Sequence, residues 1–375
     1  MEIQHIYGVS RFSSINGVTC YINSILHILQ HIPEWVNYIN TLKFKFIIND
    51  KIKKQIELNP NLDEKTVIKS YLVLEYYKLI KISLENENAT LVPTSFKRLL
   101  GIKNDIFSEL NHQDSQEFLS FLLSQIIEEV GVKKQYISYE KTYTKDNLTT
   151  QDIIHIISAN KVWSNTMSFE NSPMKLLFTG LIEHKRKCVC CNTYTSMFEP
   201  SLTIELTIPI KEQFDKFKIF DIYECFDDMI FGEELDSDNK MECSLCGIKN
   251  KSISKTLFWK TPKVLILHIK RFDENFNKIN NNILYPIKNL NLIEYFNPIS
   301  PYKLSSEYDL MGVNIHHNIG FDKEDISCGH YTSFIKNQFN NKWYHYNDDA
   351  TVEHINDINI LQNKNAYLLF YYRHD

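Results

Sequence analysis

The amino-acid sequence predicts an α+β enzyme, and two changes along the chain lead to this prediction. Helical periodicity dominates the first third, whereas alternating apolar residues and short apolar runs dominate the part after about residue 176. Two Cys-x-x-Cys pairs mark a metal-binding region ahead of most of the strands. Helices followed by antiparallel strands are the order expected of an α+β domain.

The helices of the first part are predicted from apolar residues spaced three and four apart. Residues Tyr21–His31 have this spacing, and Pro33 helps to end the helix. Three further helices are expected, over Val67–Ser83, over Phe96–Leu100 after a Pro-Thr-Ser cap, and over Asp114–Ile127. Residues 131–172 are polar, so we expect an irregular excursion there with one short helix near Asp152–Ile157.

The strands of the second part are predicted from two patterns. Residues 202–208 alternate between apolar and polar side chains, which indicates a half-buried strand. Val264–Ile269 is a nearly continuous apolar run, typical of a central strand. Later strands are expected over Leu310–His316, Tyr331–Lys336, Lys342–Tyr346 and Ala366–Tyr372.

Composition and charge restrict the class of protein. A chain of 375 residues that is 43% hydrophobic can bury a large core, and only 10 Gly and 10 Pro argue against a long flexible linker. The net charge of −5 lacks the basic footprint of nucleic-acid binding, and clusters such as Lys51–Lys54 indicate solvated helix faces. Because no apolar run has the length of a signal peptide or a membrane span, we expect reduced cysteines in the cytoplasm or nucleus.

A cysteine and a histidine at opposite ends of the chain have the contexts of a thiol hydrolase pair. Cys20 follows a polar segment with an Asn-Gly turn and opens a predicted helix, whose dipole should lower the thiol pKa. His330 follows Gly329, which leaves room for close backbone approach, and it begins a strand that would hold the ring. A structural buried cysteine is the alternative interpretation of Cys20.

A thiol hydrolase also needs a group that orients the histidine. Asn347 and Asp348 follow the predicted strand Lys342–Tyr346, where either side chain could reach the Nδ1 atom of His330. A simple polar turn is the alternative interpretation of these residues.

Four cysteines predict a metal site. Cys188 and Cys191 form one Cys-x-x-Cys pair, and Cys243 and Cys246 form another. Four thiolates suit tetrahedral zinc and leave no open position, so one structural zinc ion is expected. Because the two pairs are far apart in the sequence, each should cap its own hairpin.

The helix predicted over Asp114–Ile127 begins with acidic side chains. Asp114 can serve as the N-cap, and Glu117 can complete a capping box. Carboxylates at a helix start can also hold a basic peptide.

Together these motifs make the chain resemble the ubiquitin-specific protease family of papain-like deubiquitinases. The motifs are TCYINSILHIL, HQDSQEFLSFLL, FTGLIEHKRKCVCC, SLTIELTIP, TPKVLILHIKRF, GHYTSFIKN and KWYHYNDDATV, in the family's order over residues 8–373. The resemblance implies one papain-like catalytic domain over 1–375, with a helical thumb over about 1–130, zinc-ribbon fingers over about 182–258, and a palm over about 131–181 and 259–375. It also implies that ubiquitin and ubiquitinated proteins are the partners, without nucleic acid or a membrane span.

The resemblance assigns roles residue by residue. Cys20 would be the nucleophile, His330 the general base, and Asn347 the orienting group, with Asp348 beside it. Four residues would contact the ubiquitin tail, namely Asp114, Glu117, Tyr21 and Tyr331. The expected reaction is hydrolysis of the peptide or isopeptide bond after the C-terminal glycine of ubiquitin, through an acyl-enzyme on Cys20.

Two positions depart from the family's pattern. The family usually has an asparagine five residues before the cysteine as the oxyanion donor, but this chain has Ile15 there and Asn16 one residue later. We therefore expect Asn16 to replace the donor. His112 stands where the acidic motif often begins with glutamine. The alternatives to an active deubiquitinase are a weak or inactive ubiquitin-binding module, motivated by Ile15, and a zinc-ribbon nucleic-acid adaptor, which leaves the Cys20 and His330 motifs unexplained.

Overall fold

A computed structural model describes most of the chain. The described residues are 10–86, 89–135, 148–210, 215, 217–235, 240–243, 245–273, 277–318, 329–338 and 340–374. The N-terminal residues 1–9, in which no signal peptide is expected, and residues 136–147 of the expected irregular excursion lie outside this set.

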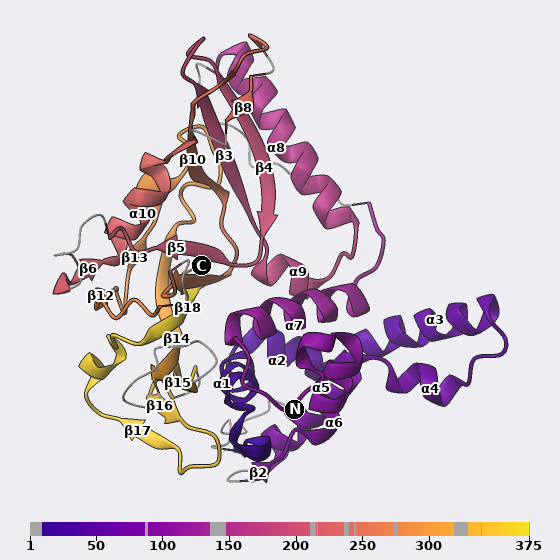
Figure 1. Ribbon diagram of the computed structural model, residues 1–375. Coiled ribbons are helices and arrows are strands. Elements are labelled where there is room, and N and C mark those ends of the chain that lie inside the picture. The colour runs from indigo at the N-terminus through magenta and orange to yellow at the C-terminus, as the bar shows by residue number, and fades with distance from the viewer. Residues whose placement is uncertain are drawn as a thin grey trace.

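The molecule has a helical part, a large sheet and a projecting arm (Figure 1). The helices are α1 Cys20–Leu29, α2 Pro33–Asn40, α3 Lys43–Leu58, α4 Glu64–Lys69, α5 Leu72–Glu85, α6 Thr94–Lys103, α7 Ser115–Val130, α8 Thr150–Ser168, α9 Pro173–Phe178 and α10 Ile222–Phe231. The strands are β1 Arg11–Phe12, β2 Thr90–Leu91, β3 Gly180–Cys188, β4 Tyr194–Ser201, β5 Ile204–Thr207, β6 Phe220–Asp221, β7 Glu233–Leu235, β8 Met241–Glu242, β9 Lys249–Asn250, β10 Ser252–Lys260, β11 Val264–Lys270, β12 Ile283–Leu284, β13 Leu290–Asn291, β14 Glu307–Asn318, β15 Gly329–Lys336, β16 Trp343–Tyr346, β17 Glu353–Ile355 and β18 Ala366–Arg373.

The large sheet has the strand order β17-β16-β15-β14-β18-β11-β5, with β13 attached to β14. Its neighbours are antiparallel except for β11 and β5, which run parallel, so the expectation of antiparallel strands holds for all but this edge. The predicted α+β class is confirmed.

Both faces of the large sheet are buried, which explains the continuous apolar run of β11. Val264 and Ile266 pack with the helices α1 and α7, whereas Leu265 and Leu267 pack with α10 on the other face. A strand covered on both faces has no position for polar side chains, so the alternating pattern disappears.

The expected helix Val67–Ser83 is wrong as a single element, because the chain breaks between α4 and α5. Tyr71 is extended, and the buried carboxylate of Glu129 in α7 accepts hydrogen bonds from the N–H groups of Leu72 and Val73 at 3.0 and 2.8 Å. A side chain distant in sequence therefore caps α5, and no local pattern reports such a cap.

The expected short helix near Asp152–Ile157 is also wrong in extent, because α8 runs for 19 residues. A capping box between Thr149 and Asp152 starts it. Its buried residues are Ile156, Ala159, Trp163 and Met167. Their helical spacing is obscured in the sequence by many polar residues and by the exposed Ile153, Ile154 and Ile157.

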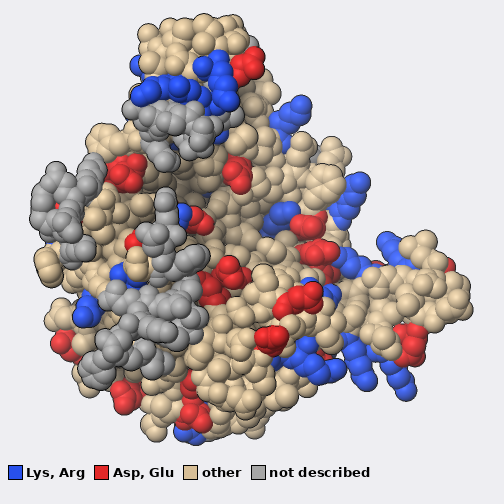
Figure 2. All heavy atoms as spheres, viewed as in Figure 1, with Lys and Arg blue, Asp and Glu red and all other residues tan. Residues whose placement is uncertain are grey.

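The arm consists of a sheet of order β4-β3-β10-β7 with α8 packed along one side (Figure 1). Trp163 of α8, Phe198 of β4 and Trp259 of β10 form its small core. At the other side of the molecule α3 and α4 project, and Figure 2 shows basic side chains along this projection. Ile52 is buried there while Lys53 and Lys54 are exposed, which confirms a solvated helix face.

Candidate active site and metal centre

The loop before Cys20 is a tight turn. Asn16 and Gly17 both have positive φ, of 52° and 74°, and Val18 N–H donates to the Ile15 carbonyl at 3.1 Å. This is the geometry of a type I′ turn, for which Asn-Gly is the preferred pair. Asn16 is exposed at the tip of the turn. The structure therefore gives Asn16 a backbone role, and its expected role as oxyanion donor stays a prediction.

Two hydroxyl groups tie this turn to the helix start. Ile15 N–H donates to Thr19 Oγ1 at 2.8 Å, and Thr19 N–H donates to Ser14 Oγ at 3.0 Å. Cys20 follows as the first residue of α1, as predicted, and its side chain is buried. The turn thus fixes the backbone at the point where the thiol begins.

His330 and Asn347 form a direct pair. His330 is the second residue of β15, and Asn347 directly follows β16. The Nε2 atom of His330 lies 2.6 Å from Asn347 Oδ1. Since Oδ1 can only accept, Nε2 carries the proton and Nδ1 keeps the lone pair that can act as a base. The expected contact at Nδ1 is therefore wrong, and the nitrogen left for the thiol is Nδ1.

Cys20 lies near the Tyr331 N–H and near Asp348, the residues that follow His330 and Asn347, but its thiol is less acidic than expected. Burial raises the pKa of Cys20 to about 11, although hydrogen bonds from backbone N–H groups, chiefly that of Tyr331, oppose the shift. The negative charge of Asp348 adds to the increase. The predicted lowering by the helix dipole is wrong for this unliganded protein, because desolvation outweighs it. The Tyr331 contact still places the sulfur next to the residue that follows His330.

Gly329 is required by close packing. A Cβ atom at Gly329 would lie 1.8 Å from the Nε2 atom of His316, so no other residue fits before His330. The sequence predicted that a backbone passes close to Gly329. The group that lies close to it is instead the buried imidazole of His316.

Asp348 lies beside Asn347 with a positive φ of 45°. Its Oδ1 atom accepts a hydrogen bond from Asn23 Nδ2 at 2.8 Å, and burial raises the pKa of its carboxyl group. Asp348 therefore binds the helix that carries Cys20 rather than the His330 ring. Its role in catalysis stays a prediction.

The acidic helix start has one capping residue and one exposed carboxylate. Asp114 Oδ1 accepts the Gln116 N–H at 2.6 Å, and its other oxygen accepts from Tyr367 Oη. Burial raises the pKa of Asp114. Glu117 is exposed, and no described residue gives its carboxylate a hydrogen bond, so the capping box is only half formed. This leaves Glu117 available to a ligand.

Both tyrosines expected at the ubiquitin tail are buried. Tyr21 is fully buried between Phe107 and Phe118, with ring centroids 6.1 and 5.7 Å away. Tyr331 is 3% exposed, and its backbone N–H is the group that contacts Cys20. Their contact with a tail stays a prediction.

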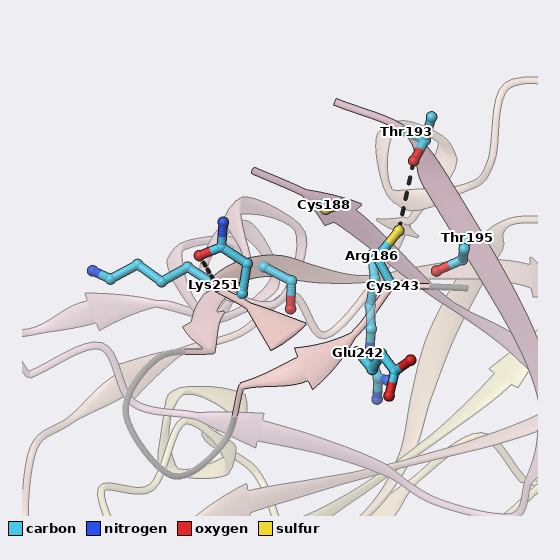
Figure 3. A pocket seen from close by; sticks show the side chains of 9 residues that line it. Arg186, Cys188, Thr193, Thr195, Glu242, Cys243 and Lys251 are labelled. Carbon is cyan, nitrogen blue, oxygen red and sulfur yellow. Dashed lines mark hydrogen bonds between the residues drawn. The ribbon is translucent and has the colours of Figure 1, made fainter. Parts of the chain in front are cut away.

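The four predicted metal ligands come together at the end of the arm, and Figure 3 shows two of them, Cys188 and Cys243. The sulfur atoms of Cys188, Cys191, Cys243 and Cys246 all lie within 4.8 Å of one another. One pair sits at the turn between β3 and β4, the other between β8 and β9, so each caps its own hairpin as expected. Backbone N–H groups of Cys246 and Leu245 lower the pKa of Cys243 to about 6. A cluster of four thiols with one already acidic fits a single metal ion.

Sequence reasoning missed two residues near the site. His317 of β14 lies opposite His330 of β15, with ring centroids 6.5 Å apart, and its Nε2 atom is 2.9 Å from Thr332 Oγ1. Asn23 binds Asp348 as described above. The signal for Asn23 was its place one turn after Cys20 on the same helix, and the signal for His317 was its place at the end of a predicted strand.

The fold is that of the papain-like cysteine proteases with a metal-bearing arm. A model of the family described as ubiquitin carboxyl-terminal hydrolase matches residues 14–371, so the chain belongs to that family. This confirms the resemblance inferred from the motifs. Among the described helices, none is both long enough and apolar enough to cross a membrane.

Individual relatives agree with this assignment. Ubiquitin carboxyl-terminal hydrolase 4 of Saccharomyces cerevisiae is 24% identical over 379 residues, which cover 95% of this chain but only 38% of that protein. The probable ubiquitin carboxyl-terminal hydrolase R319 of Acanthamoeba polyphaga mimivirus is 26% identical over 441 residues, which cover 99% of this chain and 92% of that one. The solved SAGA Ubp8/Sgf11/Sus1/Sgf73 DUB module bound to ubiquitin aldehyde superposes with a TM-score of 0.63 at 20% identity, covering 100% of this chain and 71% of that one.

Proposed function

We propose that the protein is a deubiquitinase, a thiol protease that hydrolyses the bond after the C-terminal glycine of ubiquitin. The observation that carries this proposal is the 2.6 Å contact between His330 and Asn347, formed where the Cys20 sulfur meets the Tyr331 N–H. The family match over residues 14–371 supports it.

The reaction follows from these positions. Nδ1 of His330 takes the Cys20 proton as the sulfur attacks the glycine carbonyl, and Asn347 Oδ1 stabilises the resulting imidazolium by accepting a hydrogen bond from its Nε2–H group. The C–N bond then breaks, and His330 returns the proton to the leaving lysine amine or peptide amine. Water hydrolyses the thioester and regenerates the thiol. The backbone N–H of Cys20 and the side chain of Asn16 are the proposed oxyanion donors.

The substrate contacts are also proposals. Glu117 is exposed at the start of α7 and suits the basic tail of ubiquitin. Asp114, Tyr21 and Tyr331 are proposed as further contacts of the tail. Ubiquitin and ubiquitinated proteins are the proposed partners, without nucleic acid. The four-cysteine cluster would hold one structural zinc ion. Every cysteine within the described part of the chain is a free thiol, which supports a reducing compartment, the cytoplasm or nucleus.

A fluorogenic amide of the ubiquitin C-terminus tests the activity. The wild-type protein should release the fluorophore, and Cys20→Ala should abolish release while keeping its affinity for ubiquitin, because Cys20 supplies the nucleophile and little of the binding surface. Cys225→Ala, which removes another buried thiol, from α10, should keep turnover. Unchanged turnover in Cys20→Ala would refute the assignment.

A weak or inactive ubiquitin-binding module remains the second candidate. The exposed position of Asn16 and the pKa of Cys20 near 11 favour it, since both leave the unliganded site poorly prepared for attack. Binding of ubiquitin without any turnover by wild-type protein would support this candidate.

A further inference from the structure

The segment that carries Asn347 leaves the sheet directly after β16 and has no strand partner of its own. Asn347 must nevertheless hold the Nε2 atom of His330 at 2.6 Å. The residues on either side of it, Tyr346 and Asp348, are bound to one helix, α1.

On one side, Tyr346 is bound to the turn that ends α1. Its hydroxyl lies 3.1 Å from the Nε2 atom of His31, and both side chains are nearly fully buried. His31 Nδ1 lies 2.7 Å from the His27 carbonyl, which can only accept, so Nδ1 carries the ring proton. Burial lowers the pKa of His31 to about 4, so the ring is neutral and Nε2 accepts a hydrogen bond from the Tyr346 hydroxyl.

The Tyr346 ring is also held from the side. The His27 ring packs against it with centroids 4.5 Å apart. Gln30 lies 3.1 Å from the Nδ1 atom of His27 and accepts a hydrogen bond from Ser83 of α5 at 2.8 Å. The Tyr346 backbone pairs with Ser333 of β15, and its side chain is held by packing and hydrogen bonding with residues of α1 and of the turn that follows α1.

On the other side, Asp348 is bound to the first turn of α1. The Asn23 amide donates to Asp348 at 2.8 Å and to the Phe12 carbonyl at 3.2 Å. This bond holds Asp348 at its positive φ of 45°, which a non-glycine residue adopts only when its surroundings enforce it.

We propose that Tyr346, acting through His31, is a positioning residue that fixes Asn347 and thereby the His330 ring. The same helix then positions Cys20, which is its first residue, and Asn347, whose neighbour Tyr346 binds His31 just after the helix end. The relative position of nucleophile and orienting group is therefore fixed by one helix. This inference rests on the proposed thiol hydrolase mechanism for its kinetic consequence, but its structural consequence for His330 does not depend on any activity.

The kinetic test compares two tyrosine hydroxyl deletions. Tyr346→Phe should lower kcat about tenfold with KM within about twofold, since a 1 Å misplacement of a catalytic group can cost about 100-fold. The matched control is Tyr308→Phe, which removes a buried hydroxyl that donates to the Pro262 carbonyl at 2.6 Å on the opposite face of the sheet. Tyr308→Phe should lose comparable thermal stability and keep kcat. Equal loss of kcat in both variants, or unchanged kcat in Tyr346→Phe, would overturn the proposal.

A spectroscopic test works without turnover. In protein with ¹⁵N-labelled histidine, the proton on His330 Nε2 should give a signal protected by Asn347, which Asn347→Ala identifies by its loss. Tyr346→Phe should weaken or shift this signal, and Tyr308→Phe should not. If no variant hydrolyses ubiquitin amides, the proposed function fails, while this comparison still decides the positioning role.

His31, which accepts the hydrogen bond from Tyr346, provides a second set of variants if Tyr346→Phe does not fold. His31→Leu should lower kcat as Tyr346→Phe does, whereas His31→Gln, which keeps an acceptor, should recover most of it. Combining His31→Leu with Tyr346→Phe should add little to either change, because both remove one interaction. Full additivity of the two losses would contradict the coupling.

Discussion

The active site and the metal-binding arm hold sulfur atoms in opposite environments. At the arm, backbone N–H groups lower the pKa of Cys243 to about 6, and its partners lie close by at the turns of two hairpins. At the active site, burial raises the pKa of Cys20 to about 11 despite the Tyr331 N–H and the start of α1. Hydrogen bonding to the thiolate therefore dominates at Cys243, while contacts with the other three sulfur atoms raise the pKa of Cys246 to about 12, and desolvation dominates at Cys20. The comparison shows that a helix start does not by itself make a cysteine reactive.

The largest effect is expected from breaking the arm. Cys246→Ala should remove the bound metal and unfold the β8–β9 hairpin, because strands of two residues cannot stay paired without it and metal binding of roughly 10–16 kcal/mol is folding energy in such sites. The zinc content measured by metal analysis should fall from one ion per chain to none. Proteolysis of the arm should become faster, and ubiquitin binding should become weaker.

Cys190→Ser is the matched control for this change. Cys190 is exposed beside Cys191 and is outside the four-sulfur cluster. This variant should keep its metal and its arm. Wild-type protein that contains no zinc and yet has an intact arm would contradict the structural role of the metal.

The second expected effect concerns the pKa of Cys20. Alkylation of the unliganded protein by iodoacetamide should accelerate about tenfold per pH unit and level off only near pH 11, because the thiolate is the reacting form. At neutral pH the thiolate fraction of Cys20 should be about 300-fold smaller than that of an ordinary free thiol with a pKa near 8.5, and alkylation should be correspondingly slow. The rate is measured from the mass of the peptide that contains Cys20.

A plateau at or below neutral pH would reverse the comparison. It would mean that the pKa of Cys20 is lowered, as its predicted place at a helix start suggested. Alkylation of Cys190 in the same samples checks that the reagent stays active across the pH range.

The fold was largely predictable because its motifs are local, whereas the errors came from contacts distant in sequence. The helix at Cys20, the strands β14, β15, β16 and β18, and each Cys-x-x-Cys pair leave a pattern within a few residues, whereas the short strand β17 was not predicted. The cap of α5 by Glu129 does not, because its acceptor and donors are in different helices. The pKa of Cys20 was missed for a similar reason, since burial depends on how α1 packs on β15.

The third expected effect separates two roles of Asn16. If its side chain stabilises the oxyanion, Asn16→Gly should lower kcat by roughly 100-fold with little change in ubiquitin affinity. Glycine keeps the positive φ of 52° without strain, so this variant removes the side chain and leaves the turn intact. We expect the lower rate.

Asn16→Ala shows the cost of the turn alone. An alanine at positive φ should lose about 1–2 kcal/mol of stability in addition to any loss of rate. If Asn16→Gly keeps full kcat and Asn16→Ala only melts earlier, Asn16 is a turn residue. In that case Ile15→Asn should speed the enzyme, because it places a donor at the family's position. Measuring its kcat beside those of the other two variants tests this.

The smallest effect is expected at Glu117. Its carboxylate is exposed at the start of α7, so an ion pair with the ubiquitin tail would be worth about 0.2–1 kcal/mol. Glu117→Gln should therefore raise KM only about one and a half- to fivefold at low salt, with kcat unchanged, and the difference should shrink as salt screens the pair. Glu128→Gln, at an exposed position near the other end of the same helix, should change neither constant. A fall in kcat without a change in KM would mean that Glu117 acts on the reacting bond rather than on the tail. Equal increases in KM for Glu117→Gln and Glu128→Gln would mean that only the total charge of α7 matters.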